Sequence, residues 1–210
     1  MPRFSRPPHL VLASAVALAL GGCAGSYTGP VEVTRFVAED PASLGQGEIT
    51  LVFPDEIASE RVRAAFAEAV SAELGKLGYT LVMGQGPVTQ VASVRTSRNP
   101  IEGSGNRGRS PVSVGVGGST GTYGSGVGLG IGINLGGGQS GPAVITELSV
   151  RISDAVGESL WEGRAQLPTS VKSPYSEVDA SARTLAAALF KDFPGGNGET
   201  VTIRVNELRD

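Results

Sequence analysis

The chain has 210 residues, of which 40% are hydrophobic and 18% charged, and its formal net charge is −3. This composition excludes a disordered acidic tail and an all-apolar membrane bundle, and the negative charge excludes bulk electrostatic capture of nucleic acid. One cysteine and one histidine leave no disulfide framework and almost no zinc or Ser-His-Asp chemistry, whereas the 31 glycines are unusually many. The length is typical of one domain with a substantial core.

The N-terminus has the organisation of a lipoprotein signal peptide. Arg3 and Arg6 supply a positive start, and residues 10–20 form an apolar run that is shorter than the about 20 residues a membrane-spanning helix needs. Leu20-Gly-Gly-Cys23 follows and resembles the bacterial lipobox, in which the cysteine sulfur takes a diacylglycerol before cleavage. An ordinary signal peptide with a chance cysteine is the alternative, but it would need all three features to coincide. The sequence therefore predicts removal of residues 1–22 and lipidation of Cys23.

Processing at Cys23 changes what the mature chain offers. Ala24, not Asp, follows the cysteine, so the usual sorting rule of diderm bacteria predicts delivery to the outer membrane, facing the periplasm. His9 lies in the removed segment, and the acylated sulfur is no longer a free thiol. Each buried CH₂ of the acyl chains contributes about 0.8 kcal/mol, so two or three chains hold the protein firmly on the membrane. We expect residues 23–30 to form a short acylated tether and residues 31–210 to form a single α+β domain.

The first half of the predicted domain contains two strands and a helix. Residues 31–37 predict a first edge strand, and the more apolar residues 49–53 predict a central strand. A helix is expected over about residues 59–77, with Ser59 as its N-cap and Gly78 at its end. Its apolar side carries residues at helical spacing: Val62, Ala65, Phe66, Ala69, Val70, Leu74 and Leu77.

The second half contains the remaining strands and a second helix. Residues 88–98 predict a strand, residues 145–153 and 160–167 predict a hairpin, residues 175–192 predict a helix and residues 200–205 predict a closing strand. The order of these elements predicts an α+β fold, a mixed or antiparallel sheet with two helices on one face. Inward positions are expected at Ala92, Val94, Leu148, Val150, Ile152, Trp161, Gly163, Ala165, Val178, Ala182, Leu185, Leu189 and Phe193.

Residues 103–141 hold about half of the glycines. Within them, residues 112–116 and 127–135 alternate branched apolar residues with glycine or small polar residues, which is the signature of a strand. A random linker would not keep every branched residue in phase. We therefore expect a glycine-rich β-hairpin insert with one apolar face and one nearly bare face.

Three roles for this hairpin are open. Its apolar face can pack on the domain, its edge can pair with a second copy, or several copies can close a membrane barrel. A lone hairpin cannot span lipid, because its edge N–H and C=O groups would stay unpaired. Packing on the domain is favoured, since a flat glycine-rich edge promotes aggregation unless it is covered.

Two short motifs match patterns of known chemistry. Residues 103–108 match the dinucleotide pattern G-x-G-x-x-G, but Pro100 and Pro111 flank them and no helix N-terminus would meet a phosphate. Residues 117–121 match the hydrolase pattern G-x-S-x-G around Ser119, but the mature chain has no histidine to serve as its base. Both are chance matches in a glycine-rich tract.

Carboxylates are the remaining route to catalysis or metal binding. Candidates gather around the predicted hairpin and at the start of the second helix: Glu147, Asp154, Glu158, Glu162, Glu177 and Asp179. Carboxylates at turns and helix N-termini are usually solvated or stabilise the helix dipole, so we expect no catalytic site, no metal and no cofactor. A local stretch of basic residues lies before and inside the insert and could touch anionic lipid headgroups or peptidoglycan-associated groups, although keeping the loop soluble is the simpler role: Arg95, Arg98, Arg107 and Arg109.

Four strings resemble bacterial envelope lipoproteins that carry the domain of unknown function numbered 4136. They are residues 109–121, 126–134, 148–154 and 160–165, and the Trp161-Glu-Gly163 region with the glycine tract is the most specific part. The resemblance covers roughly residues 31–205. It implies an α+β fold, a lipobox and an envelope location, and it implies no activity, ligand or catalytic residue.

The sequence thus predicts a lipid-anchored outer-membrane lipoprotein that faces the periplasm and acts as a non-enzymatic binding or envelope-assembly protein. Its expected partners are the membrane, through the anchor at Cys23, and an envelope protein or a second copy of itself, but not nucleic acid. The alternative is an oligomeric secretion- or pore-like component that uses the glycine-rich hairpins.

Overall fold

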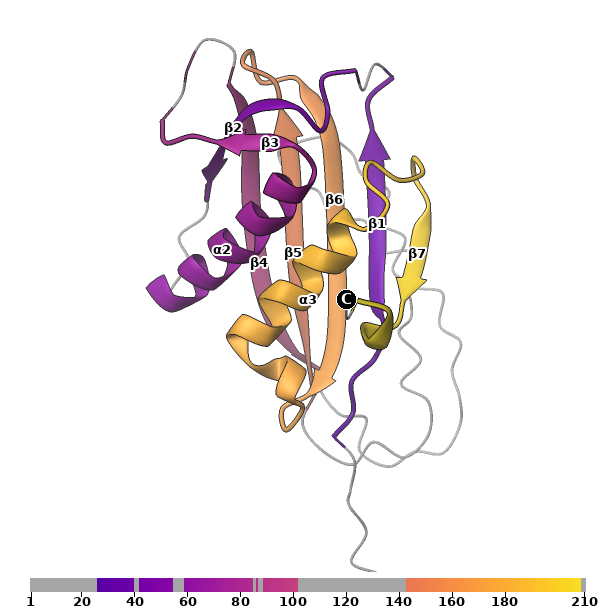
Figure 1. Ribbon diagram of the computed structural model, residues 1–210. Coiled ribbons are helices and arrows are strands. Elements are labelled where there is room, and N and C mark those ends of the chain that lie inside the picture. The colour runs from indigo at the N-terminus through magenta and orange to yellow at the C-terminus, as the bar shows by residue number, and fades with distance from the viewer. Residues whose placement is uncertain are drawn as a thin grey trace, which may run out of the picture.

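Two helices cover one face of a seven-stranded sheet in the computed structural model, which describes residues 26–39, 42–54, 59–84, 86, 89–101 and 143–208 (Figure 1). The predicted α+β class is confirmed. The elements in chain order are β1 (Val31–Val37), β2 (Gly47–Val52), α2 (Glu60–Lys76), β3 (Tyr79–Leu81), β4 (Gln90–Ile101), β5 (Ala143–Ser153), β6 (Ser159–Ser170), η2 (Pro174–Ser176), α3 (Val178–Phe190), β7 (Thr200–Ile203) and η3 (Val205–Leu208).

Three of the predicted segments lie outside the described residues: the signal peptide over residues 1–22, the lipidation site Cys23, and the glycine-rich hairpin insert over residues 103–141. Within the part of the chain that the structure describes, none of the helices is long and apolar enough to cross a membrane.

The sheet is mixed, with the strand order β3-β2-β4-β5-β6-β1-β7. Strand β2 runs parallel to both of its neighbours, and every other neighbouring pair is antiparallel. The predicted places of two strands were wrong. Strand β1 is not at the edge, because β7 pairs outside it with Val33 opposite Val201. Strand β2 is not central, because only β3, a three-residue strand that the sequence did not predict, separates it from the edge.

Helix α2 forms where the apolar periodicity predicts it. Ser59 has the extended backbone of an N-cap, although its side chain makes no capping hydrogen bond. At the other end Gly78 has a φ of 106°, and a Cβ there would come within 2.7 Å of the Gly45 oxygen, so only glycine fits this turn. Every side chain that α2 buries belongs to the apolar side predicted from the sequence: Ala65, Phe66, Ala69, Val70 and Leu74.

Helix α3 is shorter than the predicted helix at both ends. Pro174 opens the separate turn η2, and the extended backbone of Glu177 divides this turn from the helix. At the C-terminal end Lys191 leaves the helical conformation and Asp192 has a φ of 55°. The predicted stripe is buried at Ala182, Leu185 and Leu189, whereas Phe193 follows the helix and packs against it from beyond its end.

The C-terminal end of α3 is fastened to β1 and β6. The Arg35 guanidinium donates to the backbone oxygens of Leu189 and Ala188, each at 2.9 Å, and thereby pairs carbonyls that have no partner within the helix. Burial lowers the pKa of Arg35, against the opposing effect of Asp192. The Trp161 ring stacks on Phe190 with 5.4 Å between centroids, and its N–H donates to the Pro194 oxygen at 2.9 Å.

The core lies between the helices and the sheet and follows the strand alternation as predicted. Ala92 and Val94 in β4, Leu148, Val150 and Ile152 in β5, and Trp161 and Ala165 in β6 are almost completely buried. Gly163 also faces this side, and a Cβ there would approach the Leu189 Cδ1 to 2.8 Å and collide with the Trp161 ring. Glycine at this position therefore permits α3 to lie close against β6.

Candidate functional site

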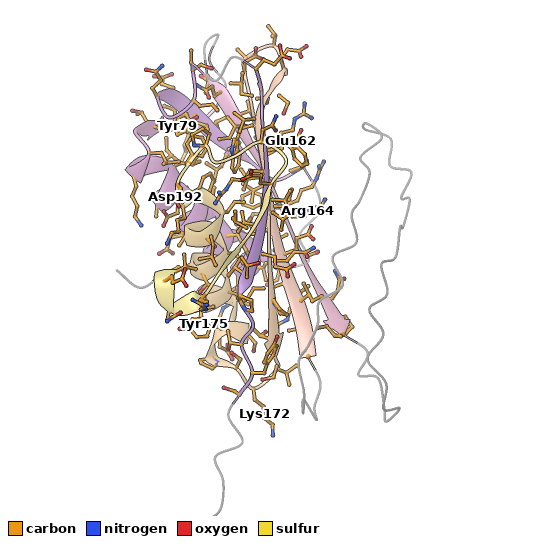
Figure 2. The ribbon with its side chains drawn as sticks, turned by 90° about the vertical axis from the view of Figure 1, so that its right-hand side faces the viewer. Tyr79, Glu162, Arg164, Lys172, Tyr175 and Asp192 are labelled. Atoms are coloured by element: carbon orange, nitrogen blue, oxygen red, sulfur yellow. The ribbon has the colours of Figure 1, made fainter. Side chains whose placement is uncertain are left out.

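The sheet face that points away from α2 and α3, hereafter the open face, carries the polar half of the strand alternation. Along β6, Trp161 is buried beneath the helices, whereas the next residue, Glu162, and Arg164 are exposed on the open face. Figure 2 shows Glu162 and Arg164 on the opposite side of the sheet from Tyr79 and Asp192. None of the described helices covers this face.

Charges of opposite sign are paired across the strands of the open face. Arg151 in β5 lies opposite Glu162 in β6, with 3.3 Å between Nε and Oε1. Glu147 accepts a hydrogen bond of 2.7 Å from its cross-strand neighbour Gln166 and also pairs with Arg164 at 3.5 Å. The side chains of Arg151, Glu162 and Arg164 are between 43% and 62% exposed. The open face therefore carries partly exposed side chains of both charges, paired across the strands.

The carboxylates that the sequence offered for catalysis do not converge. Glu147 and Glu162 take part in the cross-strand pairs, and Asp154 accepts hydrogen bonds from the backbone N–H groups of Val156 and Glu158 in the β5–β6 turn. Asp179 pairs with Arg61 at 3.0 Å and so links the starts of α3 and α2. Glu158 and Glu177 are exposed. Among the described residues, no group of three or more His, Cys, Asp or Glu could hold a metal ion.

The last residues of the predicted tether are bound to the end of β6. The Ser170 N–H donates to the backbone oxygen of Tyr27 at 3.0 Å, and the Gly29 N–H donates to the backbone oxygen of Pro168 at 2.8 Å. The Thr28 and Ser173 hydroxyls lie 2.6 Å apart. Thr28 also forms a β-bridge with Thr169. The sequence did not predict this attachment, since the residues around Tyr27 are too few to show a strand periodicity.

Two strand ends that flank residues 102–142 lie at the same end of the sheet. Ile101 closes β4 opposite Ala143, the first residue of β5, and Ala143 in turn lies opposite Ser170 of β6. We call this end of the sheet, formed by residues 26–30, 98–101, 143–145 and 168–176, the tether end. In Figure 1 it is the lower end of the molecule, where the indigo start of the described chain meets the arrowhead of β6.

The basic residues of the predicted stretch separate in the structure. Arg95 lies on the open face and is exposed, whereas Arg98 lies at the tether end and donates to the Ser176 oxygen at 2.6 Å. Arg107 and Arg109 lie outside the described residues.

Two shallow grooves open on the helix-covered side of the molecule and beside the tether end. One, of about 360 Å³, lies between α2, α3 and η3, and its polar lining includes the ion pair between Glu73 and Lys76. The other, of about 680 Å³, runs between residues 28–30 and residues 202–207. Near it the pKa of Tyr27 is raised, because burial and the Glu32 carboxylate both disfavour the phenolate.

No protein-family model matches the chain, and no curated protein matches it, so the resemblance to the envelope lipoproteins stays a prediction. Among solved structures, the chain is similar to a PDZ domain protein from Parabacteroides distasonis, with a TM-score of 0.49 and 16% sequence identity. That similarity covers 91% of this chain but only 42% of the other, so this chain spans less than half of its length.

The PelC dodecamer from Paraburkholderia phytofirmans is a more distant neighbour, with a TM-score of 0.34 and 10% identity over 75% of this chain. The similarity covers 92% of the PelC chain in one crystal structure of the dodecamer and 93% in a second. At these TM-scores the similarities do not bear on what this chain binds.

Proposed function

We propose that the protein is a lipoprotein of the bacterial envelope, acylated at Cys23 and held at the outer membrane with its domain in the periplasm. The observation that carries the proposal is the position of Leu20-Gly-Gly-Cys23 directly before the fold. Tyr27, the first of the described residues to hydrogen-bond to the sheet, follows Cys23 by only four residues. The acylated cysteine would therefore fix a folded domain close to the membrane, without a long linker.

The role of the domain in this proposal is binding or assembly rather than catalysis. The arrangement of the acidic side chains supports it, because Glu147, Asp154, Glu162 and Asp179 each hold a structural partner and do not face a common space. The open face supports it as well. Its partly exposed charges offer many weak contacts to a partner of complementary charge. Such contacts favour specificity and fast association more than affinity.

The anchor is tested by replacing the sulfur that would carry it. In cells that produce the full chain, Cys23→Ser should abolish acylation and move the protein out of the membrane fraction, and the mass of the wild-type protein should correspond to a chain that starts at an acylated Cys23. Ser26→Ala, three residues further on, is the matched control and should fractionate like the wild type. A Cys23→Ser protein that is still processed and still sediments with the membranes would overturn the proposal.

An oligomeric secretion- or pore-like component is the second candidate. The alternating pattern of residues 127–135 favours it, because such a strand could pair with the same strand of a second copy. The mass of the acylated protein in detergent distinguishes the two candidates. A monomer would remove the oligomeric one, and a closed ring would support it.

A further inference from the structure

The tether end is the surface of the domain from which the N-terminal chain departs. The Tyr27 oxygen accepts its hydrogen bond from Ser170, and Thr28 is held by Thr169 and Ser173. A trans chain extends by at most about 3.6 Å per residue, so the Cα of Cys23 lies within about 14 Å of the Cα of Tyr27. These hydrogen bonds therefore fix the point on the domain from which the chain leads to the anchor.

The two residues that flank residues 102–142 lie in the same place. Ile101 pairs with Ala143, Ala143 pairs with Ser170, and Ser170 donates to Tyr27. The opposite end of the sheet is far away. Strand β5 has 11 residues and, at about 3.4 Å per residue, separates Ala143 from the β5–β6 turn by roughly 34 Å.

The exposed side chains of the tether end include apolar and basic ones, besides the polar Ser26 and Asn99. Val171 is 42% exposed, Pro100 and Pro174 are exposed, and Lys172 projects at the lower end of the molecule in Figure 2. Arg98 adds a second cation, and the acidic residues that adjoin the tether end in the sequence are Glu102, after Ile101, and Glu177, after Ser176. Small apolar side chains beside cations are suited to the headgroup layer of an anionic bilayer.

We infer that the tether end of the sheet faces and contacts the phospholipid bilayer. The inference rests on the proposed anchor at Cys23 and adds an orientation to it. With the anchor within about 14 Å, the sheet stands with β6 pointing towards the membrane and the β5–β6 turn pointing away from it. The chain then leaves Ile101 and returns at Ala143 on the bilayer side.

The orientation is tested by a probe at each end of the sheet in the acylated full-length protein. Lys172→Cys at the tether end and Val156→Cys in the β5–β6 turn both replace exposed side chains, and acylation of Cys23 leaves the introduced thiol as the one that reacts with a fluorophore. Each labelled protein is reconstituted into vesicles of phosphatidylethanolamine and phosphatidylglycerol that contain a lipid with a nitroxide on its headgroup. Circular dichroism verifies that both variants are folded.

Quenching of the label at position 172 should exceed quenching at position 156 several-fold. Equal quenching at both positions, or stronger quenching at position 156, in a protein whose mass shows the acyl chains would overturn the orientation and leave the anchor standing. A protein whose mass shows no acyl chains, and which the vesicles do not retain, would overturn the anchor and the orientation together. An acylated protein that is unquenched at position 172 would overturn the lipid contact and leave the anchor standing.

Discussion

Consecutive residues of β6 face two regions of different character. Towards the helices, Trp161 and Ala165 are packed without solvent and Gly163 accommodates the Trp161 ring and α3. Towards the open face, Glu162 and Arg164 are half-exposed and hold charged partners on β5. The same backbone therefore presents a dry, tightly packed face and a solvated, charged one.

The covered face stabilises the fold, whereas the open face is the one available for recognition. Burial of apolar area and closely fitted aromatic rings contribute several kcal/mol per side chain, whereas half-exposed ion pairs contribute at most about 1 kcal/mol each. Substitutions on the covered face should destabilise the protein. Substitutions on the open face should leave it folded, which makes them suitable for testing whether that face binds a partner.

The largest effect is expected for Trp161→Ala. Trp161 is 1% exposed, and its ring contacts Phe190 and Phe193 with centroid distances of 5.4 and 5.3 Å. Truncation should lower the free energy of unfolding by about 3–5 kcal/mol, since it leaves a cavity and removes the hydrogen bond to Pro194. Urea unfolding measures the loss. Glu162→Ala is the matched control in the same strand, and a loss of similar size for both variants would contradict the division between the two faces.

Arg35→Met should lower the free energy of unfolding by less than Trp161→Ala does, but by more than any substitution on the open face. Methionine retains an unbranched apolar stem, but the carbonyls of Leu189 and Ala188 lose a charged donor at the C-terminal end of α3. Hydrogen bonds to a charged group contribute about 1.5–3 kcal/mol, so we expect a loss of about 2–4 kcal/mol for the pair. Arg164→Met on the open face is the control, expected to change stability by less than about 1 kcal/mol. If the two substitutions cost the same, Arg35 does not hold the helix end.

Local periodicity accounts for the parts of this fold that the sequence could predict. Helix α2 shows five buried residues at helical spacing, and β5 and β6 alternate over many residues around a short turn. The burial of Arg35 could also have been predicted from the sequence, because Arg35 continues the alternation that buries Val31 and Val33. Its charge predicted an exposed position, but the free carbonyls at the end of α3 accept its hydrogen bonds and make its burial favourable.

Long-range pairing accounts for what the sequence could not predict. Whether β1 lies at an edge depends on its pairing with β7, which follows more than 160 residues later. The sequence of residues 31–37 alone does not indicate that pairing. The three residues of β3 are too few for a periodic signal. The tether end likewise brings together Tyr27, Ile101, Ala143 and Ser170, which are far apart in the chain, so no local motif could reveal it.

A pH series should separate Tyr79 on the covered side from the exposed charges. Tyr79 is 5% exposed, and burial raises the pKa of its hydroxyl above the usual value of 10.0. The folded protein then keeps a proton that the unfolded chain releases, so the stabilisation is complete below about pH 10 and is lost as the pH rises towards the folded pKa. The free energy of unfolding of Tyr79→Phe should fall less steeply than that of the wild type above pH 10. Parallel curves would mean that Tyr79 titrates in the same way in both states.

The smallest effect is expected for the ion pair between Arg151 and Glu162. Their side chains are 43% and 51% exposed, with 3.3 Å between Nε and Oε1, and a pair so exposed is screened by water and salt. A double-mutant cycle with Arg151→Ala and Glu162→Ala should give a coupling energy below about 1 kcal/mol that shrinks further at high salt. A coupling well above this value that persists in salt would show that the open face contributes to stability as the covered face does. It would also remove the argument that this face can be altered without unfolding the protein.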